Sequence, residues 1–230
     1  MNQPLLSVSR HEEKYLLNPA EAVALRGMLD ALLRRDRDSA GGAYFIRSLY
    51  FDTPENTDYE DKVLGVSERS KLRMRLYDPA GGQARLERKA KSGIYGHKTG
   101  LWLTRAEAEA LIAGDDTPLC RQDTPAARRL WAAFRREWRR PAVLIDYERT
   151  AWALDFERVR LTIDEHVRAA KSSALFDPAV PMLGLHSGAM TILEVKYDRF
   201  LPGHLRAALS SFCAQPMSIS KYAIAREMLY

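Results

Sequence analysis

One short segment constrains the fold of this 230-residue chain more than any other: from Arg69 to Tyr77, basic and apolar side chains alternate. Successive residues of a β-strand point to opposite sides, so such a strand has one apolar face and one basic face. The basic set is Arg69, Lys71, Arg73 and Arg75. Four neighbouring positive charges repel one another unless an anion lies among them. The segment therefore predicts a strand whose ionic face meets an anionic partner.

The same division between faces recurs along the chain. With that segment included, strands are expected at Val8–Leu16, Phe45–Asp52, Ser70–Tyr77, Ala84–Lys91, Ala142–Thr150, Val159–Asp164 and Thr191–Tyr197. Their ionic faces carry mostly cations and a few carboxylates, which are Glu12, Glu87, Asp164 and Glu194. A cationic lining with few acids suits a triphosphate and its divalent metal, because cations bind phosphate oxygens and carboxylates bind Mg²⁺ or Mn²⁺.

Helix-capping signals predict five helices between these strands. Asn18-Pro19, Thr104-Arg105, Thr124-Pro125, Pro202 and Ser220 each mark the start of one. Because the strands cluster without strict alternation with helices, the pattern favours an α+β fold with an antiparallel sheet.

Two architectures fit the two-faced strands. In the first, the apolar faces form the core and the ionic faces meet water, which pattern alone favours. In the second, the sheet closes into a barrel whose ionic faces line a polar interior. The helices favour the barrel, since each has an apolar stripe that needs a sheet face to cover.

Composition narrows the class of protein. Lys and Arg total 35 against 30 acids, and 46% of the residues are hydrophobic, enough for one large domain spanning 1–230. The two cysteines show no metal-binding spacing, and no signal peptide or membrane-length apolar run is apparent. We therefore expect a cytoplasmic protein without a membrane span. The cationic faces lack interleaved aromatic residues, which argues against a nucleic-acid partner.

Eight short motifs together resemble one known family, the VTC domain. The motifs are Arg10-His11-Glu12-Glu13-Lys14-Tyr15, Arg47 to Thr53, Lys71 to Tyr77, Leu86-Glu87-Arg88-Lys89, Tyr147-Glu148-Arg149, Arg160 to Asp164, Ile192 to Tyr197 and Ser220-Lys221-Tyr222. This domain is the catalytic part of the vacuolar transporter chaperone polyphosphate polymerase. It belongs to the triphosphate tunnel metalloenzymes, with the CYTH proteins as relatives.

The resemblance implies an antiparallel, roughly eight-stranded β-barrel tunnel with a polar, cationic interior and helices packed on the outside. It implies that the tunnel binds ATP or another nucleoside triphosphate, or inorganic polyphosphate or tripolyphosphate. The polymerase branch moves the terminal phosphate of ATP onto a growing polyphosphate. Delivery of that product across a membrane would require a membrane-protein partner, because this chain shows no span.

By position, the resemblance also assigns residues. The catalytic cations would be Lys14, Arg73, Arg75, Lys89, Arg160 and Lys221. Further substrate-binding residues would be Arg10, Lys71, Lys98, Arg149, Lys196 and Ser220. The ligands of a Mn²⁺ or Mg²⁺ cofactor would be Glu194 and Glu12.

One departure bears on the reaction. CYTH relatives begin with Glu-x-Glu-x-Lys, and Arg10 stands here in place of the first Glu. One carboxylate fewer favours the polymerase branch over a tripolyphosphate or nucleoside triphosphate hydrolase. A non-catalytic module that binds polyphosphate or inositol phosphate is the remaining alternative, and it could dispense with Glu194.

Several residues also have a purely structural interpretation. Lys98 lies in a loop-like stretch, Ser220 can simply cap a helix, and Asp52 is expected to start a turn at Thr53 rather than bind metal. The tryptophans are expected to be packing residues; they are Trp102, Trp131, Trp138 and Trp152.

Overall fold

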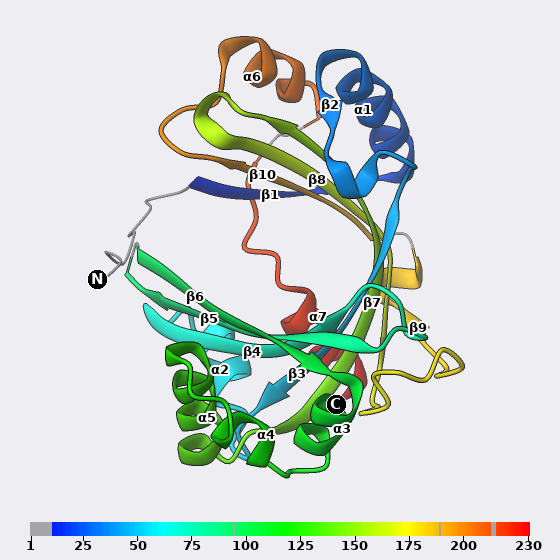
Figure 1. The fold of residues 1–230 in the computed structure, drawn as a ribbon. Coiled ribbons are helices and arrows are strands. Elements are labelled where there is room, and N and C mark those ends of the chain that lie inside the picture. The colour runs from blue at the N-terminus through cyan, green and yellow to red at the C-terminus, as the bar shows by residue number, and fades with distance from the viewer. Residues whose placement is uncertain (1–10, 94, 189, 213–214) are drawn as a thin grey trace.

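A computed structural model describes residues 11–93, 95–188, 190–212 and 215–230 and shows one continuous antiparallel sheet (Figure 1). Eight strands follow the order β1-β10-β8-β7-β3-β4-β5-β6, while the two-residue β2 and β9 pair with β7 and β8. The strands are β1 (His11–Leu17), β2 (Arg34–Arg35), β3 (Tyr44–Asp52), β4 (Glu68–Leu76), β5 (Gln83–Ser92), β6 (Tyr95–Thr104), β7 (Arg140–Leu154), β8 (Val159–Ala170), β9 (Leu183–Gly184) and β10 (Thr191–Tyr197).

Seven α-helices are present in the described residues. They are α1 (Pro19–Leu32), α2 (Thr57–Val63), α3 (Arg105–Ile112), α4 (Thr117–Cys120), α5 (Pro125–Glu137), α6 (Gly203–Ser210) and α7 (Lys221–Leu229). The predicted caps are confirmed: Asn18 and Thr104 form capping boxes, and Thr124 and Ser220 accept hydrogen bonds from the first turns of α5 and α7. None of the described helices is both long enough and apolar enough to cross a membrane.

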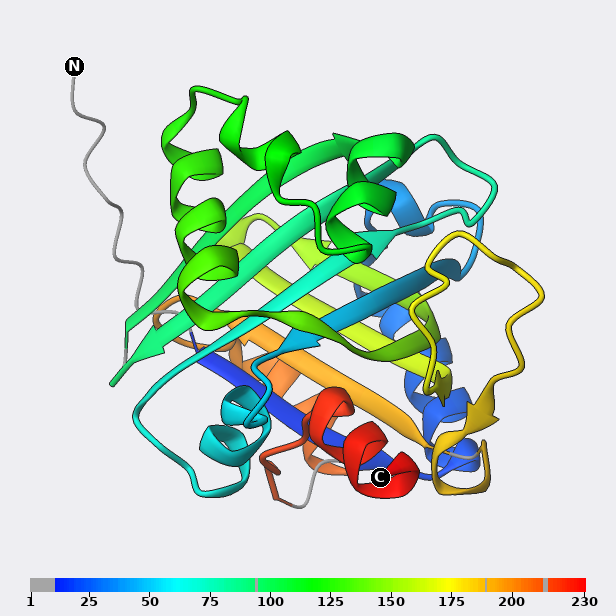
Figure 2. The same cartoon turned by 90° about the horizontal axis from the view of Figure 1, so that it is seen from below.

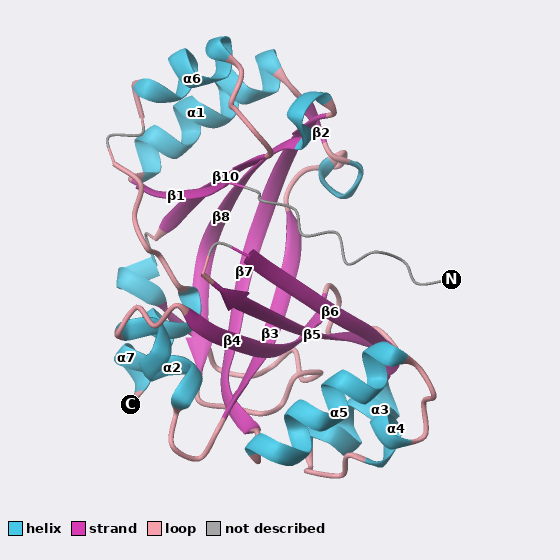
Figure 3. Cartoon of the chain, turned by 90° about the vertical axis from the view of Figure 1, so that its left-hand side faces the viewer, coloured by secondary structure: helices cyan, strands magenta, loops and turns pink. Residues whose placement is uncertain are grey.

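The sheet curls strongly around a central space, with helices stacked on its convex side (Figures 1 and 3). α1 and α6 cover the half built from β1, β10 and β8 (Figure 1). α3, α4 and α5 cover the half built from β3 to β6 (Figure 2). The α+β class and the antiparallel tunnel fold are therefore confirmed. No described backbone pairing joins the edge strands β1 and β6, so hydrogen bonds do not close the curl into a complete barrel.

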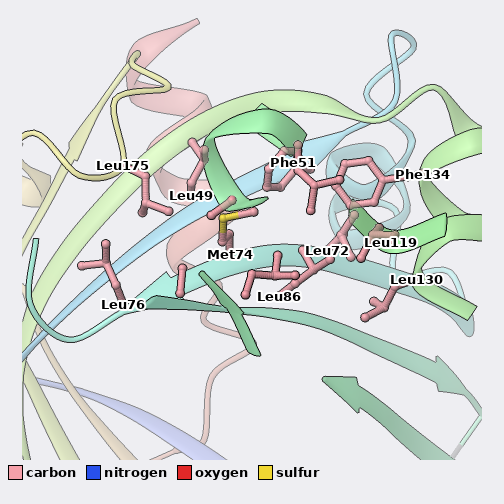
Figure 4. Close-up of a cluster of buried hydrophobic side chains, with 14 of the residues drawn as sticks. Leu49, Phe51, Leu72, Met74, Leu76, Leu86, Leu119, Leu130, Phe134 and Leu175 are labelled. Carbon is pink, nitrogen blue, oxygen red and sulfur yellow. The ribbon is translucent and has the colours of Figure 1, made fainter. Parts of the chain in front are cut away.

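The apolar faces of the strands turn outward, beneath the helices. Leu72, Met74 and Leu76 lie in one convex-side cluster with Phe134 of α5 (Figure 4). Leu161 and Leu193 lie in a second cluster under α1 and α6. Burial of these side chains is the main favourable contribution to folding, and it fixes which face of each strand looks inward, because a slip of one residue would expose the whole apolar set.

One helix departs from the prediction that all helices pack outside. α7 lies against the concave face, where Tyr222 stacks on Tyr50 of β3 with ring centroids 5.0 Å apart. A third apolar cluster forms there with Ile46, Ile145 and Ala225. The concave face is thus apolar where α7 covers it and ionic elsewhere.

Three details of the sequence-based assignment can be compared with the structure. β6 was not predicted, because Gly96 and Gly100 interrupt its strand pattern, and Lys98 therefore lies on a strand and not in a loop. Asp52 starts the turn as predicted: it accepts a hydrogen bond from the backbone N–H of Thr53 at 2.8 Å, and others from the backbone N–H groups of Asp58 and Tyr59 at the start of α2. Residues 8–10 of the first expected strand lie outside the described residues.

The convex-side core predicts a graded response to truncation. Leu72 is fully buried, so Leu72→Ala should lower the free energy of unfolding by about 2 to 5 kcal/mol. Leu64→Ala is the matched control, because its side chain is 76% exposed and should cost less than about 0.5 kcal/mol. Urea unfolding followed by circular dichroism measures both. Equal losses in the two variants would contradict the assignment of the convex face to the core.

Candidate functional site: an ionic cluster on the concave face

Side chains from seven strands and from the first turn of α7 converge on the uncovered part of the concave face. The strand register places Lys14 beside Glu194, Lys196 beside Arg160, and Arg73 beside Glu87. The members with described positions are Glu12, Lys14, Lys71, Arg73, Arg75, Arg85, Glu87, Lys89, Lys98, Arg149, Arg160, Asp164, Glu194, Lys196 and Lys221. Cations clearly outnumber carboxylates in this set, which we call the tunnel cluster.

Glu87 is the most heavily contacted carboxylate on the β4–β6 side. Arg73 donates to it from Nε and Nη2 at 3.0 and 2.9 Å, and Lys98 Nζ lies 2.6 Å from Oε1. Arg75 and Arg85 lie at 4.0 and 3.7 Å. Burial opposes ionisation of this carboxyl group, but the charges of Arg73 and Arg75 outweigh burial and lower the pKa of Glu87 to about 2.

Glu12 and Glu194 form a second centre at the edge strand β1. Lys14 Nζ lies 3.2 Å from Glu12 and 3.7 Å from Glu194, and Lys196 Nζ lies 3.9 and 3.1 Å from the same two carboxylates. Burial disfavours the charge of Glu194, yet Lys196 and Lys14 hold its pKa well below its usual range. Lys89 of β5 reaches Glu12 at 3.0 Å. This ion pair joins the two sides of the curled sheet where no backbone pairing does.

Asp164 anchors the third centre and is fully buried. Arg149 binds it in a bidentate manner, with N–O distances of 2.6 and 2.8 Å, and Lys221 at the start of α7 donates to it as well. Lys221 also lies over the ring of Tyr147, 4.6 Å from the centroid. Burial raises the pKa of Asp164, but Arg149 and Lys221 prevail and hold it at about 2.

Two titratable groups in the tunnel cluster region, Lys71 and Tyr50, have lowered pKa values. Burial is the largest influence on Lys71, and with the charges of Lys14 and Lys62 it lowers the pKa of Lys71 to about 8. Burial alone would raise the pKa of the Tyr50 phenol, but the charge and hydrogen bond of Arg73 lower it to about 8. The lowered pKa of Tyr50 is therefore due to neighbouring positive charge, whereas burial contributes most to the lowered pKa of Lys71 and the neighbouring cations add to it.

The structure brings together the residues that the sequence predicted as one site. Lys71 Nζ lies 2.6 Å from the Ser220 hydroxyl, which caps α7, and Arg160 pairs with Asp36 at 2.6 Å. Arg10 lies outside the described residues. Arg69 leaves the predicted basic row: it donates to the carbonyl of Val66 and lines an outer cavity.

The sequence-based assignment gave the wrong role to two tryptophans and missed one tyrosine of the site. Trp102 is not a packing residue, because it is half exposed and lies under Arg85, whose guanidinium carbon is 5.6 Å from the ring centroid. Trp138 is 70% exposed and does not pack in the core. The hydroxyl oxygen of Tyr147 accepts a hydrogen bond from Arg75 Nη2 at 3.2 Å. Tyr147 shares a strand face with Arg149, and that two-residue spacing was the available signal.

Among the described strand residues of this region, four polar side-chain atoms are buried and have no hydrogen-bond partner. They are Arg75 Nε, Ser48 Oγ, Thr162 Oγ1 and Arg85 Nε, and the register places all four residues on the concave face. Buried polar groups are nearly always satisfied in folded proteins. Such unsatisfied groups beside a cationic lining are consistent with a site that accepts a polar ligand.

The donor set also fits a divalent metal ion when phosphate is present. Glu12 and Glu194 supply the carboxylate oxygens that Mg²⁺ and Mn²⁺ prefer. Within the described residues, no group of three or more His, Cys, Asp or Glu side chains is placed to hold a metal. Mg²⁺ commonly uses one or two carboxylates together with substrate phosphates, so the metal would depend on the bound phosphates for further ligands.

A separate cavity of about 830 Å³ opens on the convex side, between α2, the ends of β4 and β5, and the end of α5. Its lining carries charges of both signs, among them the buried pair of Arg139 and Asp58. None of the predicted site residues that the structure describes lines this cavity. The cationic excess is thus a property of the concave face.

The buried pair of Asp164 and Arg149 predicts a specific pH dependence. A folded-state pKa of about 2 against an ordinary value of 3.8 contributes stability that is present above pH 3.8 and is lost as the pH falls toward 2. Asp164→Asn should therefore lower the free energy of unfolding by on the order of 2 kcal/mol at pH 6 and by much less at pH 2. Urea unfolding at several pH values measures the gap. A gap independent of pH would contradict the assignment, and Asp123→Asn, with a side chain 92% exposed, is the control.

Comparisons with solved structures find several similar chains at low sequence identity. A "putative adenylate cyclase" from Bacillus halodurans superimposes with a TM-score of 0.50 and 13% identity, covering 91% of this chain and 94% of the other. A second "putative adenylate cyclase", from Vibrio parahaemolyticus, gives a TM-score of 0.49 and 11% identity with 94% and 96% covered. A Pyrococcus horikoshii protein gives 0.45 and 12% with 96% and 99% covered. At 13% identity, the similarity to the Bacillus halodurans structure shows the fold alone. No curated protein sequence matches the chain.

The family itself is established by sequence. The family model described as the VTC domain matches residues 9–230, which is nearly the whole length and includes every strand of the curled sheet. This chain belongs to the VTC domain family.

Proposed function

We propose that the protein transfers phosphoryl groups on a triphosphate or polyphosphate bound within the tunnel cluster, and that it acts as a polyphosphate polymerase with ATP as donor. The observation that supports this most strongly is the convergence of cations from both sides of one curled sheet. Phosphoryl transfer requires alignment and charge neutralisation more than covalent chemistry by the protein. An extended anion that contacts several strands at once would be aligned by them, and their cations would neutralise its charge.

The proposed roles follow from position. The best-buried cations, Arg75, Arg149 and Lys221, have side chains at most 13% exposed and would hold the phosphates that lie deepest. Lys89 and Lys98, which are 61% and 51% exposed, would meet the anion at the opening. The remaining proposed contacts are Lys14, Lys71, Arg73, Arg160, Lys196 and Ser220. Guanidinium groups suit this task because their planar donors match phosphate oxygens.

Glu194 and Glu12 would hold a Mn²⁺ or Mg²⁺ ion against the phosphates. Bound there, the metal would neutralise charge on the transferring group. Lys14 and Lys196 now contact both carboxylates, so these lysines would turn toward phosphate oxygens as the metal and substrate bind.

The acidity of the interior carboxylates favours a phosphate acceptor over water. The pKa values of Glu87 and Asp164 are about 2, and that of Glu194 is well below its usual range. Groups this acidic are weak general bases near neutral pH. A hydrolase must deprotonate water, whereas the end of a polyphosphate is already ionised. Transfer to polyphosphate therefore fits these residues better than hydrolysis.

A non-catalytic module for polyphosphate or inositol phosphates is the second candidate. It is favoured by the observation that no group of three or more His, Cys, Asp or Glu side chains in the described residues is placed to hold a metal ion, because binding of an anion does not require one. The paired carboxylates Glu12 and Glu194 count against it, because anion binding alone does not need them.

A cytoplasmic location and a membrane-protein partner stay predictions.

Purified protein incubated with ATP and Mn²⁺ should form long-chain polyphosphate, detected by gel staining and by release of ADP. Arg75→Ala and Glu194→Ala should each reduce the rate by about 100-fold or more, since Arg75 would contact the transferring group and Glu194 would hold the metal ion that neutralises its charge. Arg105→Ala, on the exposed surface of α3, is the matched control and should leave the rate unchanged. Release of free phosphate without polymer would favour a hydrolase. Unchanged ATP with every divalent metal would contradict an enzymatic role.

Ligand class is tested separately by competition. Tripolyphosphate should displace a fluorescent ATP analogue, because both present a chain of phosphates to the same cations. A single-stranded oligonucleotide of equal total charge should displace it poorly, because its phosphates cannot align within the tunnel. Fluorescence anisotropy measures both. Equal displacement by the oligonucleotide would point to nonspecific binding by surface charge.

A further inference from the structure

Backbone pairing forces like charges together on the concave face of β4, β5 and β6. Within the tunnel cluster, cations lie directly opposite one another in three cross-strand pairs: Lys71 with Lys89, Arg75 with Arg85, and Lys89 with Lys98. Arg69 and Lys91 form a fourth such pair near the ends of β4 and β5. Like charges in such positions destabilise a sheet. These three strands are described in full, and Glu87 is the one carboxylate that they place on this face.

Glu87 is placed to offset that repulsion. Its side chain is 3% exposed, and four cations surround it: Arg73, Arg75, Arg85 and Lys98. The carboxylate stays ionised at any pH near neutrality, because its pKa is about 2. Within the described residues, the ion pairs of Glu87 are with these four cations. Glu12 and Glu194, by contrast, lie close enough together to share Lys14 and Lys196. Glu87 therefore has the surroundings of a counter-ion and not those of a metal ligand.

The cations around Glu87 remain within reach of a ligand. The side chains of Lys98 and Arg73 are 51% and 26% exposed, so each can turn toward an anion that enters the central space. These cations cannot be fully engaged by the carboxylate and by phosphate at the same time. Glu87 and the ligand must therefore compete for them.

We propose that Glu87 is a resident counter-anion: it occupies the cations of β4 to β6 while the tunnel is empty, and a polyphosphate chain displaces it on binding. This inference rests on the proposed function, because it assigns a role to Glu87 within the same site. Two consequences follow. Glu87 stabilises the ligand-free protein, and it weakens ligand binding, which lets a chain move or leave.

The test is Glu87→Gln, which keeps the shape of the side chain and removes its charge. Isothermal titration calorimetry with tripolyphosphate, without metal, should show binding roughly tenfold tighter than in the wild type, the size expected for one charge acting through a partly buried site. The melting temperature of the ligand-free variant should be lower, and tripolyphosphate should raise it by more than it raises that of the wild type.

Asp146→Asn is the matched control. Asp146 is a buried carboxylate that pairs with Arg47 through two contacts of 2.8 Å, and the register places both on the convex side. Its loss should lower the melting temperature but leave the affinity for tripolyphosphate within about twofold of the wild type. A gain in affinity is thus the result that a merely structural role for Glu87 would not produce.

The outcomes separate the two proposals. If wild-type protein binds tripolyphosphate neither without metal nor with Mn²⁺, the proposed function is wrong. If the wild type binds and Glu87→Gln binds equally or more weakly, the counter-anion role is wrong and the proposed function stands. Should Glu87→Gln be insoluble, recovery by refolding with tripolyphosphate would support the role. Failure to recover with tripolyphosphate, when Asp146→Asn refolds, would overturn it.

Discussion

The repulsion among cations on one face of a curled sheet is the constraint on which the rest of this structure depends. Apolar burial beneath the convex-side helices turns the ionic faces inward, and the curl then brings cations from opposite halves together. Such an arrangement persists only if anions lie among the cations. The chain supplies its own in Glu12, Glu87, Asp164 and Glu194, each in contact with at least two cations. These carboxylates do not cancel the charge, and the remainder is what a phosphate chain would neutralise.

The same interactions also shape the tunnel. Lys89 and Glu12 join β5 to β1 by an ion pair where no described backbone hydrogen bonds connect the edge strands. Lys71 and Lys221 attach the first turn of α7 to β4 and β8 through Ser220 and Asp164. Site and scaffold are therefore coupled, since cations proposed to bind substrate also hold the two ends of the sheet and the last helix in place.

Much of this arrangement could be predicted from sequence because side-chain alternation is a local property. The spacing of Arg73 and Arg75 against Leu72 and Met74 determines two faces without any knowledge of the fold. The helix caps are equally local, which is why the starts of α1, α3, α5 and α7 were found. The charge of the inner faces, once enclosed, indicates the class of ligand.

The rest depends on contacts between distant segments. β6 has two glycines and a lysine where a strand pattern would have larger or apolar residues, and only its pairing with β5 makes it a strand. The position of α7 on the concave face follows from the stacking of Tyr222 on Tyr50, which no local signal reports. Likewise, the sequence shows that Glu87 lies among cations on its own strand, but not that partners from β4 and β6 converge on it.

The most direct test is a crystal structure of the protein with a non-hydrolysable nucleoside triphosphate and Mn²⁺. The triphosphate should lie along the concave face, with its oxygens on Arg73, Arg75 and Arg149, and with the metal between the phosphates and Glu194. Electron density for the triphosphate in the convex-side cavity beside Arg139, with the concave cations still paired to their carboxylates, would contradict the account.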